Sequence, residues 1–167
     1  MNPYPDTLSH QIRFDTGWNL ITIPVGNNWW ASTLGDIISG CQMISWFNAS
    51  DQSYETYIVG GPPGFDFPIV DGYGLFVLVN TDNLLTMMGE SISSVGVSLL
   101  QGWNMIGWYQ TYNTTASSLA SNISGCEMVS WFNATTQSYE TYILGGPPGF
   151  DFVISPVSYT HLRAHET

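Results

Sequence analysis

Two repeated pairs of acidic residues are the groups in this sequence best suited to acid–base chemistry. Glu55 with Asp66, and Glu140 with Asp151, could supply the two carboxylates of a glycoside hydrolase. Each pair recurs unchanged, and an active site is seldom kept intact in every tandem copy, so we interpret these acids as exposed strand residues and loop caps. His10 lies in a polar stretch without a motif for nucleophilic catalysis. The sequence therefore predicts no catalytic residue, no cofactor and a protein that is not an enzyme.

Calcium is the metal that the sequence could best accommodate, because several aspartates fall in expected turns where oxygen ligands could converge. These weak candidates are Asp51, Asp66, Asp71 and Asp82. Thr136 replaces Asp51 in the second copy of the repeat, and no Asp-x-Asp-x-Asp-Gly pattern is present. We therefore predict no metal site and keep structural calcium as the alternative.

Two cysteines, Cys41 and Cys126, stand at equivalent positions of the repeat. A disulfide would need their Cα atoms within about 7 Å of each other. Equivalent points of tandem modules rarely come so close, so we expect two buried thiols and keep the bridge as the alternative. One cysteine per copy cannot complete a zinc site.

Aromatic residues are the strongest candidates for binding, because sugars stack on exposed aromatic faces. Trp18 and Trp46 lie in apolar segments and recur in the second copy, which is typical of core packing. Trp29 and Trp30 instead precede an expected helix, and threonines replace them in the second copy. We predict that Trp29 and Trp30 are the pair that contacts a ligand or neighbour. Packing over the edge of the core is the alternative.

Four asparagines begin Asn-x-Ser/Thr sequences, the acceptor motif for N-glycosylation of secreted proteins. They are Asn48, Asn113, Asn122 and Asn133. Asn48 and Asn133 fall at the same expected hairpin turn and are the better candidates. Asn122 lies on an expected helix and is the poorest.

All these residues belong to an internal repeat with an offset of 85 residues. Between 41–67 and 126–152, 22 of 27 positions are identical, whereas between 17–40 and 102–125 only 11 of 24 match. Such a long period suits a small domain in tandem rather than a solenoid repeat. The sequence therefore predicts two related folding modules.

The repeat divides the chain into two modules and a tail. We predict a complete first module at 11–95 and a second module at 97–156 that lacks the counterpart of 72–95. We expect the second module to miss strands and to expose an apolar face. Residues 157–167 differ in composition and resemble a translated sequencing adapter, so we expect this tail to be non-native and set its two histidines aside.

Each module is expected to contain about six strands and one short helix. The strand segments of the first module are 18–24, 42–47, 54–59, 75–79, 84–88 and 95–100. Ser32 is the expected N-cap of a helix that ends near Gly40, and residues 48–53 form a hairpin turn. This pattern predicts a mainly β fold of small β-sandwich or barrel-like modules in tandem.

The order of several motifs resembles a repeat of large secreted proteins from archaea and bacteria. Gly17-Trp-Asn-Leu-Ile-Thr-Ile-Pro24, Ile44-Ser-Trp-Phe-Asn48 and Asp71-Gly-Tyr-Gly-Leu-Phe-Val77 are similar to the GWNLISLP-type repeat of surface, S-layer-like proteins. Phe47 and Leu75-Phe76 depart from its usual residues. The resemblance implies an extracellular scaffold and brings no catalytic residues.

Charge and hydropathy exclude some classes of binding partner. Thirteen acidic residues face two basic ones, and the net charge of −11 disfavours nucleic acid and anionic lipid. No segment reaches the roughly 18 apolar residues of a membrane span. We predict a structural or adhesive protein, extracellular or in the cell envelope, whose partners are neighbouring copies or other envelope proteins. Carbohydrate binding through exposed aromatics, with glycans as partners, is the alternative function.

Overall fold

A computed structural model describes the chain over residues 7–90, 92, 94–110, 112–155 and 159–164, with backbone alone at 7–8 and 159–164. Strands dominate, and the two helices are short: α1 (Ala31–Ile37) and α2 (Ala116–Asn122). The predicted mainly β class is therefore confirmed. The four sheets within the described residues are antiparallel, and none of them closes on itself.

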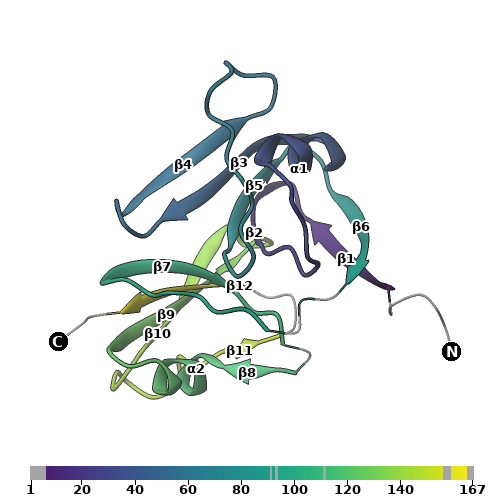
Figure 1. Cartoon of the computed structure of the whole chain (residues 1–167). Helices are drawn as coiled ribbons and strands as arrows, with labels where there is room; N and C mark the ends of the chain where they lie inside the picture. Colours follow the sequence, from purple (N-terminus) through teal and green to yellow (C-terminus); the bar gives the residue numbers. More distant parts are fainter. Residues whose placement is uncertain (1–6, 91, 93, 111, 156–158, 165–167) are drawn as a thin grey trace, which may run out of the picture.

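Six strands and one helix build the first module, and five of these strands lie where the sequence predicts them, whereas the first strand is not predicted. The strands are β1 (Thr7–Phe14), β2 (Gly17–Ile21), β3 (Cys41–Asn48), β4 (Ser53–Ile58), β5 (Leu75–Val79) and β6 (Asn83–Glu90). One sheet has the order β2-β5-β3-β4, and β1 pairs separately with β6 (Figure 1). The inner strand β5 is apolar at every position, which is typical of a strand covered on both faces.

One face of this sheet carries the core of the first module. Strand residues Ile44 and Val77 are fully buried there, together with Leu34 from α1 and Phe14 from β1. The helix and the β1–β6 pair lie over this face (Figure 1). The opposite face is also apolar, so it needs a second cover.

A carboxylate from a distant loop caps α1. The helix begins at Ala31, and the side chain of the N-cap residue Trp30 makes no capping hydrogen bond. Asp66 instead accepts hydrogen bonds from the backbone N–H of Ser32 at 2.9 Å and from its hydroxyl at 2.5 Å. The carboxylate thus satisfies a free helix donor and places negative charge at the positive end of the helix. Ser32 as the N-cap is therefore wrong, because the helix begins one residue earlier and its capping carboxylate comes from a distant loop.

The second module repeats this architecture at the predicted offset. Its strands are β7 (Gly102–Gly107), β8 (Thr114–Thr115), β9 (Cys126–Asn133), β10 (Ser138–Ile143), β11 (Val153–Ile154) and β12 (Tyr159–Ala164). Asp151 accepts hydrogen bonds from the backbone N–H and hydroxyl of Ser117 at 2.9 and 2.6 Å, as Asp66 does from Ser32. The two modules therefore share the four-stranded sheet, the helix and the helix cap.

The tail contributes a strand that the sequence analysis does not predict. β12 lies between β7 and β9, in the place that β5 takes between β2 and β3 (Figure 1). The register agrees too, because Ala164 pairs with Gly102 as Val79 pairs with Gly17. The expectation that the second module lacks this strand is wrong, since strand pairing uses backbone groups that the tail supplies. Residues 157–158 and 165–167 of the tail lie outside the described residues.

Residues 95–100, predicted as a strand, do not form one. By the repeat offset they correspond to part of β1, which pairs with β6 in the first module. In the described part of the chain no segment takes the place of β6 beside them. The prediction fails because an isolated apolar stretch has no partner for its backbone hydrogen bonds.

The helix cap of the second module yields a test of stability against pH. Burial raises the pKa of Asp151, but hydrogen bonds from Ser117 and from the backbone N–H of Phe152 outweigh it, so the folded pKa is lowered. The ionised carboxyl therefore stabilises the fold above its unfolded pKa of about 3.9. This contribution is lost as the pH falls through the lower folded pKa.

We expect Asp151→Ala to lower the free energy of unfolding at pH 7 by about 1 kcal/mol, the usual cost of losing a cap. The difference from the wild type should shrink as the pH falls below about 4, because the wild-type carboxylate becomes protonated there. Guanidinium unfolding at several pH values measures both effects. Asp36→Ala, at an exposed position on α1, is the control and should change little.

Candidate functional site

The two modules meet through the outer faces of their four-stranded sheets. Buried side chains from both modules form one hydrophobic cluster, Leu20, Phe47, Phe76, Met105 and Phe132, against which Trp18 and Trp103 pack. We call these seven residues the seam. At its centre the rings of Phe76 and Phe132 lie 5.2 Å apart and nearly perpendicular, at 85°, a favoured aromatic geometry. In the seam, the apolar outer face of each four-stranded sheet is covered by the outer face of the other.

Two glutamines fasten the seam reciprocally. Gln52, in the β3–β4 turn, accepts a hydrogen bond from the N–H of Trp103 at 2.8 Å and donates one to the carbonyl of Trp103 at 3.1 Å. Its counterpart Gln137 makes the same two bonds with Trp18, at 2.9 and 2.8 Å. We call these four bonds the glutamine latch. Reciprocal contacts of this kind define an isologous interface, so a pseudo-two-fold axis relates the modules.

Local backbone geometry explains why these residue types hold the latch. Gln52 and Gln137 both have φ of 52°, and the amide of each also donates to the carbonyl of the alanine three residues earlier in its own turn. Gly17 and Gly102, next to the latched tryptophans, have φ of 110° and 101°. A Cβ on Gly17 would lie 2.8 Å from Oε1 of Gln137. Glycine is therefore required there both for the backbone conformation and for room.

Several contacts between the modules have no counterpart among the described residues, including a hydrogen bond from the hydroxyl of Thr135 to Asp15 at 2.9 Å and the contacts of Tyr109. The hydroxyl of Tyr109 in the second module lies 2.5 Å from Oγ1 of Thr22 and accepts a hydrogen bond from the N–H of Gly72 at 2.7 Å. Burial raises the pKa of Tyr109, and these hydrogen bonds offset only part of the rise. The phenol therefore stays protonated and holds the loop before β5.

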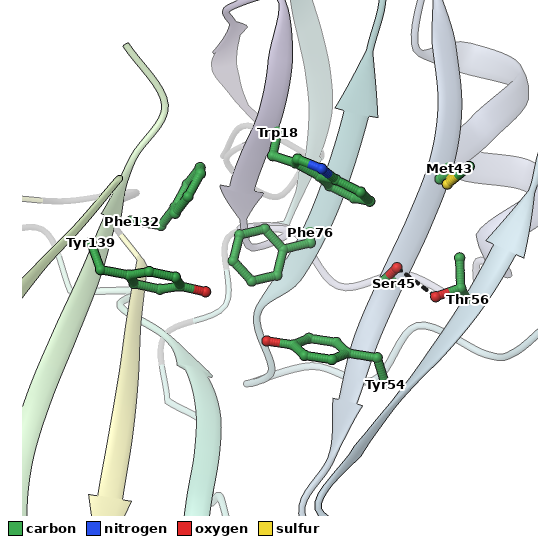
Figure 2. A pocket seen from close by; sticks show the side chains of 8 residues that line it. All are labelled: Trp18, Met43, Ser45, Tyr54, Thr56, Phe76, Phe132 and Tyr139. Carbon is green, nitrogen blue, oxygen red and sulfur yellow. Dashed lines mark hydrogen bonds between the residues drawn. The ribbon is translucent and has the colours of Figure 1, made fainter. Parts of the chain in front are cut away.

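Two grooves open along the seam. The first has a volume of ≈ 400 Å³ and is lined by Trp18, Met43, Ser45, Tyr54, Thr56, Phe76, Phe132 and Tyr139 (Figure 2). The second has a volume of ≈ 420 Å³ and is lined by Phe47, Tyr54, Trp103, Ser130, Tyr139 and Thr141. Tryptophan, serine, tyrosine and threonine recur at counterpart positions. The grooves are thus a pseudo-symmetric pair rather than an isolated packing gap.

The grooves combine aromatic walls with hydroxyl groups. Ser45 and Thr56 share a hydrogen bond of 2.7 Å between their hydroxyls, and their counterparts share one of 2.8 Å. Tyr54 and Tyr139 are 48% and 50% exposed and line both grooves. Burial raises the pKa of each phenol, and the hydrogen bond between the two tyrosines lowers that of Tyr54 and raises that of Tyr139. The grooves therefore suit an uncharged ligand with apolar faces and hydroxyls.

The predicted binding pair, Trp29 and Trp30, lies outside these grooves. Trp29 packs against the core of the first module. Trp30 is 48% exposed and forms an isolated backbone bridge with Pro68. The structure thus separates the two side chains between core and surface, and their contact with a ligand stays a prediction.

The four aspartates considered for calcium do not converge on one point. Each accepts a hydrogen bond from a different residue: Asn48 for Asp51, Ser32 for Asp66, Asn27 for Asp71 and Thr16 for Asp82. Within the described residues, no three His, Cys, Asp or Glu side chains gather in a group that could hold a metal ion. The turns that carry these acids are held by hydrogen bonds to neighbouring polar groups.

The sequons differ in accessibility. Asn48 and Asn133 are half-buried, and their amides donate to Glu55 and Glu140 at 3.0 and 3.3 Å. Asn122 is exposed on α2, and its amide donates to the carbonyl of Ser118. Asn113 is exposed in the loop before β8. On accessibility, Asn113 is a better acceptor than the two hairpin asparagines that the sequence favours.

Both cysteines are free thiols, so the predicted preference for thiols over a bridge is confirmed. Cys41 is half-buried and Cys126 is buried. Each thiol donates to the carbonyl two residues later, that of Met43 at 3.8 Å and that of Met128 at 3.6 Å. Burial raises the pKa of Cys41 to about 11 and also raises that of Cys126.

Comparison with known proteins adds no family: no family model, curated protein or solved structure matches the chain. None of the helices in its described part is long and apolar enough to cross a membrane. The class of protein therefore rests on the fold and the seam. The chain is a mainly β pair of tandem modules joined face to face.

Sequence reasoning missed the grooves because it assigned Trp18 to the core of its own module. A signal was present in β5, whose unbroken Leu-Phe-Val-Leu-Val run indicates that both faces of the sheet are covered. One helix and two strands can cover only one face. The repeat itself could not show that the other face meets its own counterpart.

The glutamine latch predicts equal effects in the two modules. We expect Gln52→Ala and Gln137→Ala each to lower the free energy of unfolding by about 1 kcal/mol, since each removes two exposed hydrogen bonds to the backbone of a tryptophan. The double variant should lose less than the sum, because both bonds hold one interface. Guanidinium unfolding measures this. Gln42→Ala, at an exposed position on β3, should change stability little.

The burial and raised pKa values of the two thiols predict that reagents modify the native chain slowly. Because burial and the raised pKa values keep thiolate scarce, a disulfide reagent at pH 8 should label Cys41 and Cys126 much more slowly than free cysteine. Two thiols per chain should react at once in denaturant. Rapid labelling of the native chain, or fewer than two reactive thiols after unfolding, would contradict this assignment.

Proposed function

We propose that this chain is a non-catalytic structural and adhesive repeat of an extracellular or cell-envelope protein, in which two modules act as one rigid unit. The seam carries this proposal. Residues from both modules bury one cluster, and the glutamine latch fixes their relative orientation at both ends. A unit of this kind spaces or contacts its neighbours without internal movement.

The placement of the repeated acids supports a structural role. Asp66 and Asp151 cap helices, and Glu55 and Glu140 accept hydrogen bonds from hairpin asparagines. Acids engaged in this way in both copies stabilise the fold itself. This accounts for their recurrence without a catalytic pair.

Surface chemistry supports the extracellular setting. The sequence contains no lysine and two arginines, Arg13 and Arg163, so trypsin-like proteases find few cleavage sites. Its sequons include the exposed Asn113, and its motifs resemble those of secreted surface proteins. Neighbouring copies and other envelope proteins are the partners that we propose.

Unfolding tests the rigid unit directly. In guanidinium, tryptophan fluorescence and far-ultraviolet circular dichroism should give one coincident transition for the whole chain, because the modules share the seam. Two separated transitions would show that the modules fold independently and would remove the basis of the proposal.

Two further measurements test its location and its lack of catalysis. An antibody against the chain should label intact source cells without permeabilisation, and labelling only after permeabilisation would refute the extracellular setting. The purified chain should hydrolyse neither polysaccharides nor peptides. Turnover that disappears in Glu55→Gln would overturn the non-catalytic assignment.

A further inference from the structure

The paired grooves go beyond what a purely structural unit requires. A flat hydrophobic contact would join the sheets equally well, yet an open space of ≈ 400 Å³ lies on one side of the seam and one of ≈ 420 Å³ on the other. Both volumes fall within the range of small-ligand sites. Tyr54 and Tyr139, each about half exposed, line both spaces.

The walls of the first groove are aromatic and held in place. Trp18 and Tyr54 lie on opposite sides of the space, and Phe76 lies between them on the side of Phe132 (Figure 2). The ring of Phe76 lies 6.1 Å from each of the other two rings, edge-on to Trp18. Because Phe76 is buried, it fixes both rings before any ligand arrives. Two facing aromatic surfaces suit a flat ligand with C–H groups on its faces.

The remaining wall offers hydrogen bonds. The hydroxyls of Ser45 and Thr56 are paired at 2.7 Å, so one of them donates to the other and a donor hydrogen is left over (Figure 2). Each oxygen also keeps lone pairs for a further donor. Such a pair matches the hydroxyl groups of a sugar, which donate and accept at once. Ser130 and Thr141 provide the same pair in the second groove.

Charge excludes acidic ligands. Among the side chains that the structure describes, no Asp, Glu, Lys, Arg or His lines either groove. The chain as a whole carries a net charge of −11, which repels anionic sugars. The ligand that fits is therefore neutral.

We propose that each seam groove binds a neutral sugar unit, stacked between a tryptophan and a tyrosine and hydrogen-bonded to the serine–threonine pair. The first site comprises Trp18, Ser45, Tyr54 and Thr56, and the second comprises Trp103, Ser130, Tyr139 and Thr141. The chain thus carries two related sugar sites, one in each groove. The exposed Trp30 belongs to neither site. Two sites on one rigid unit strengthen attachment to a glycan surface by avidity.

Indole N–H signals in a two-dimensional nitrogen–proton NMR spectrum of the full chain report each groove separately, because Trp18 and Trp103 line one groove each. The probes are the neutral disaccharides cellobiose, maltose, lactose, mannobiose and chitobiose, with digalacturonate as the anionic comparison. We expect at least one neutral disaccharide to shift both signals saturably, with a dissociation constant on the order of 1 mM. Digalacturonate should shift neither.

Matched variants assign the sites. Trp18→Ala should abolish binding in the first groove and leave the Trp103 shift, and Trp103→Ala should do the reverse. The double variants Ser45→Ala/Thr56→Val and Ser130→Ala/Thr141→Val remove the hydroxyls in pairs, so they should keep the fold and weaken binding about tenfold in their own groove. Trp30→Ala is the control and should bind as the wild type does.

Three outcomes would overturn the proposal. The first is no saturable shift with any neutral disaccharide up to ~50 mM, a concentration well above the expected dissociation constant. The second is binding that Trp30→Ala abolishes and the groove variants leave intact. The third is unchanged affinity in both hydroxyl-pair variants. The proposal of a rigid unit is tested separately, by whether the fluorescence and circular dichroism transitions coincide on unfolding.

Discussion

Two carboxamide groups hold the arrangement of this molecule. β2 and β7 are edge strands, so one side of each carries backbone donors and acceptors outside the sheet. On β7, Met105 and Gly107 bond to the backbone of residues 72–74. Gln52 and Gln137 pair with both backbone groups of one tryptophan on these edges. The side-chain amide thus makes the same two hydrogen bonds, to a backbone N–H and a carbonyl, that one residue of an added strand would make. Because each module gives a glutamine and receives one, the two sheet faces must oppose each other about an axis.

That axis constrains the side chains on the facing surfaces. Residues near it meet their own counterparts or close neighbours, so the surface must be complementary to itself. Phe132, the counterpart of Phe47, packs edge to face on Phe76 of the other module. Farther from the axis the two sheets leave room, and the two grooves open there. The same geometry therefore produces both the contact that joins the modules and the spaces beside it.

Local signals in the sequence predict most of the strands and none of the long-range pairings. The hairpin of β3 and β4 and the strand β5 lie where apolar runs and the polar turn place them. The cap of α1 was missed because Asp66 lies 34 residues from Ser32. The strand expected at 95–100 fails because strand formation depends on a partner that only the fold provides. The sequence indicates that aromatic residues form the candidate site. It cannot show which of them line the grooves, because that depends on how the two sheets dock.

The reciprocal contacts between the modules also constrain how the two copies of the repeat can evolve. A substitution at Gln52 is felt at Trp103, in the other copy, so neither copy can drift independently of its sister. Duplication of a single copy by unequal crossing-over would leave Leu20, Phe47 and Phe76 of the extra copy facing water. Such a surface invites aggregation. Selection would therefore favour gene arrays with an even number of copies, gained and lost in twos.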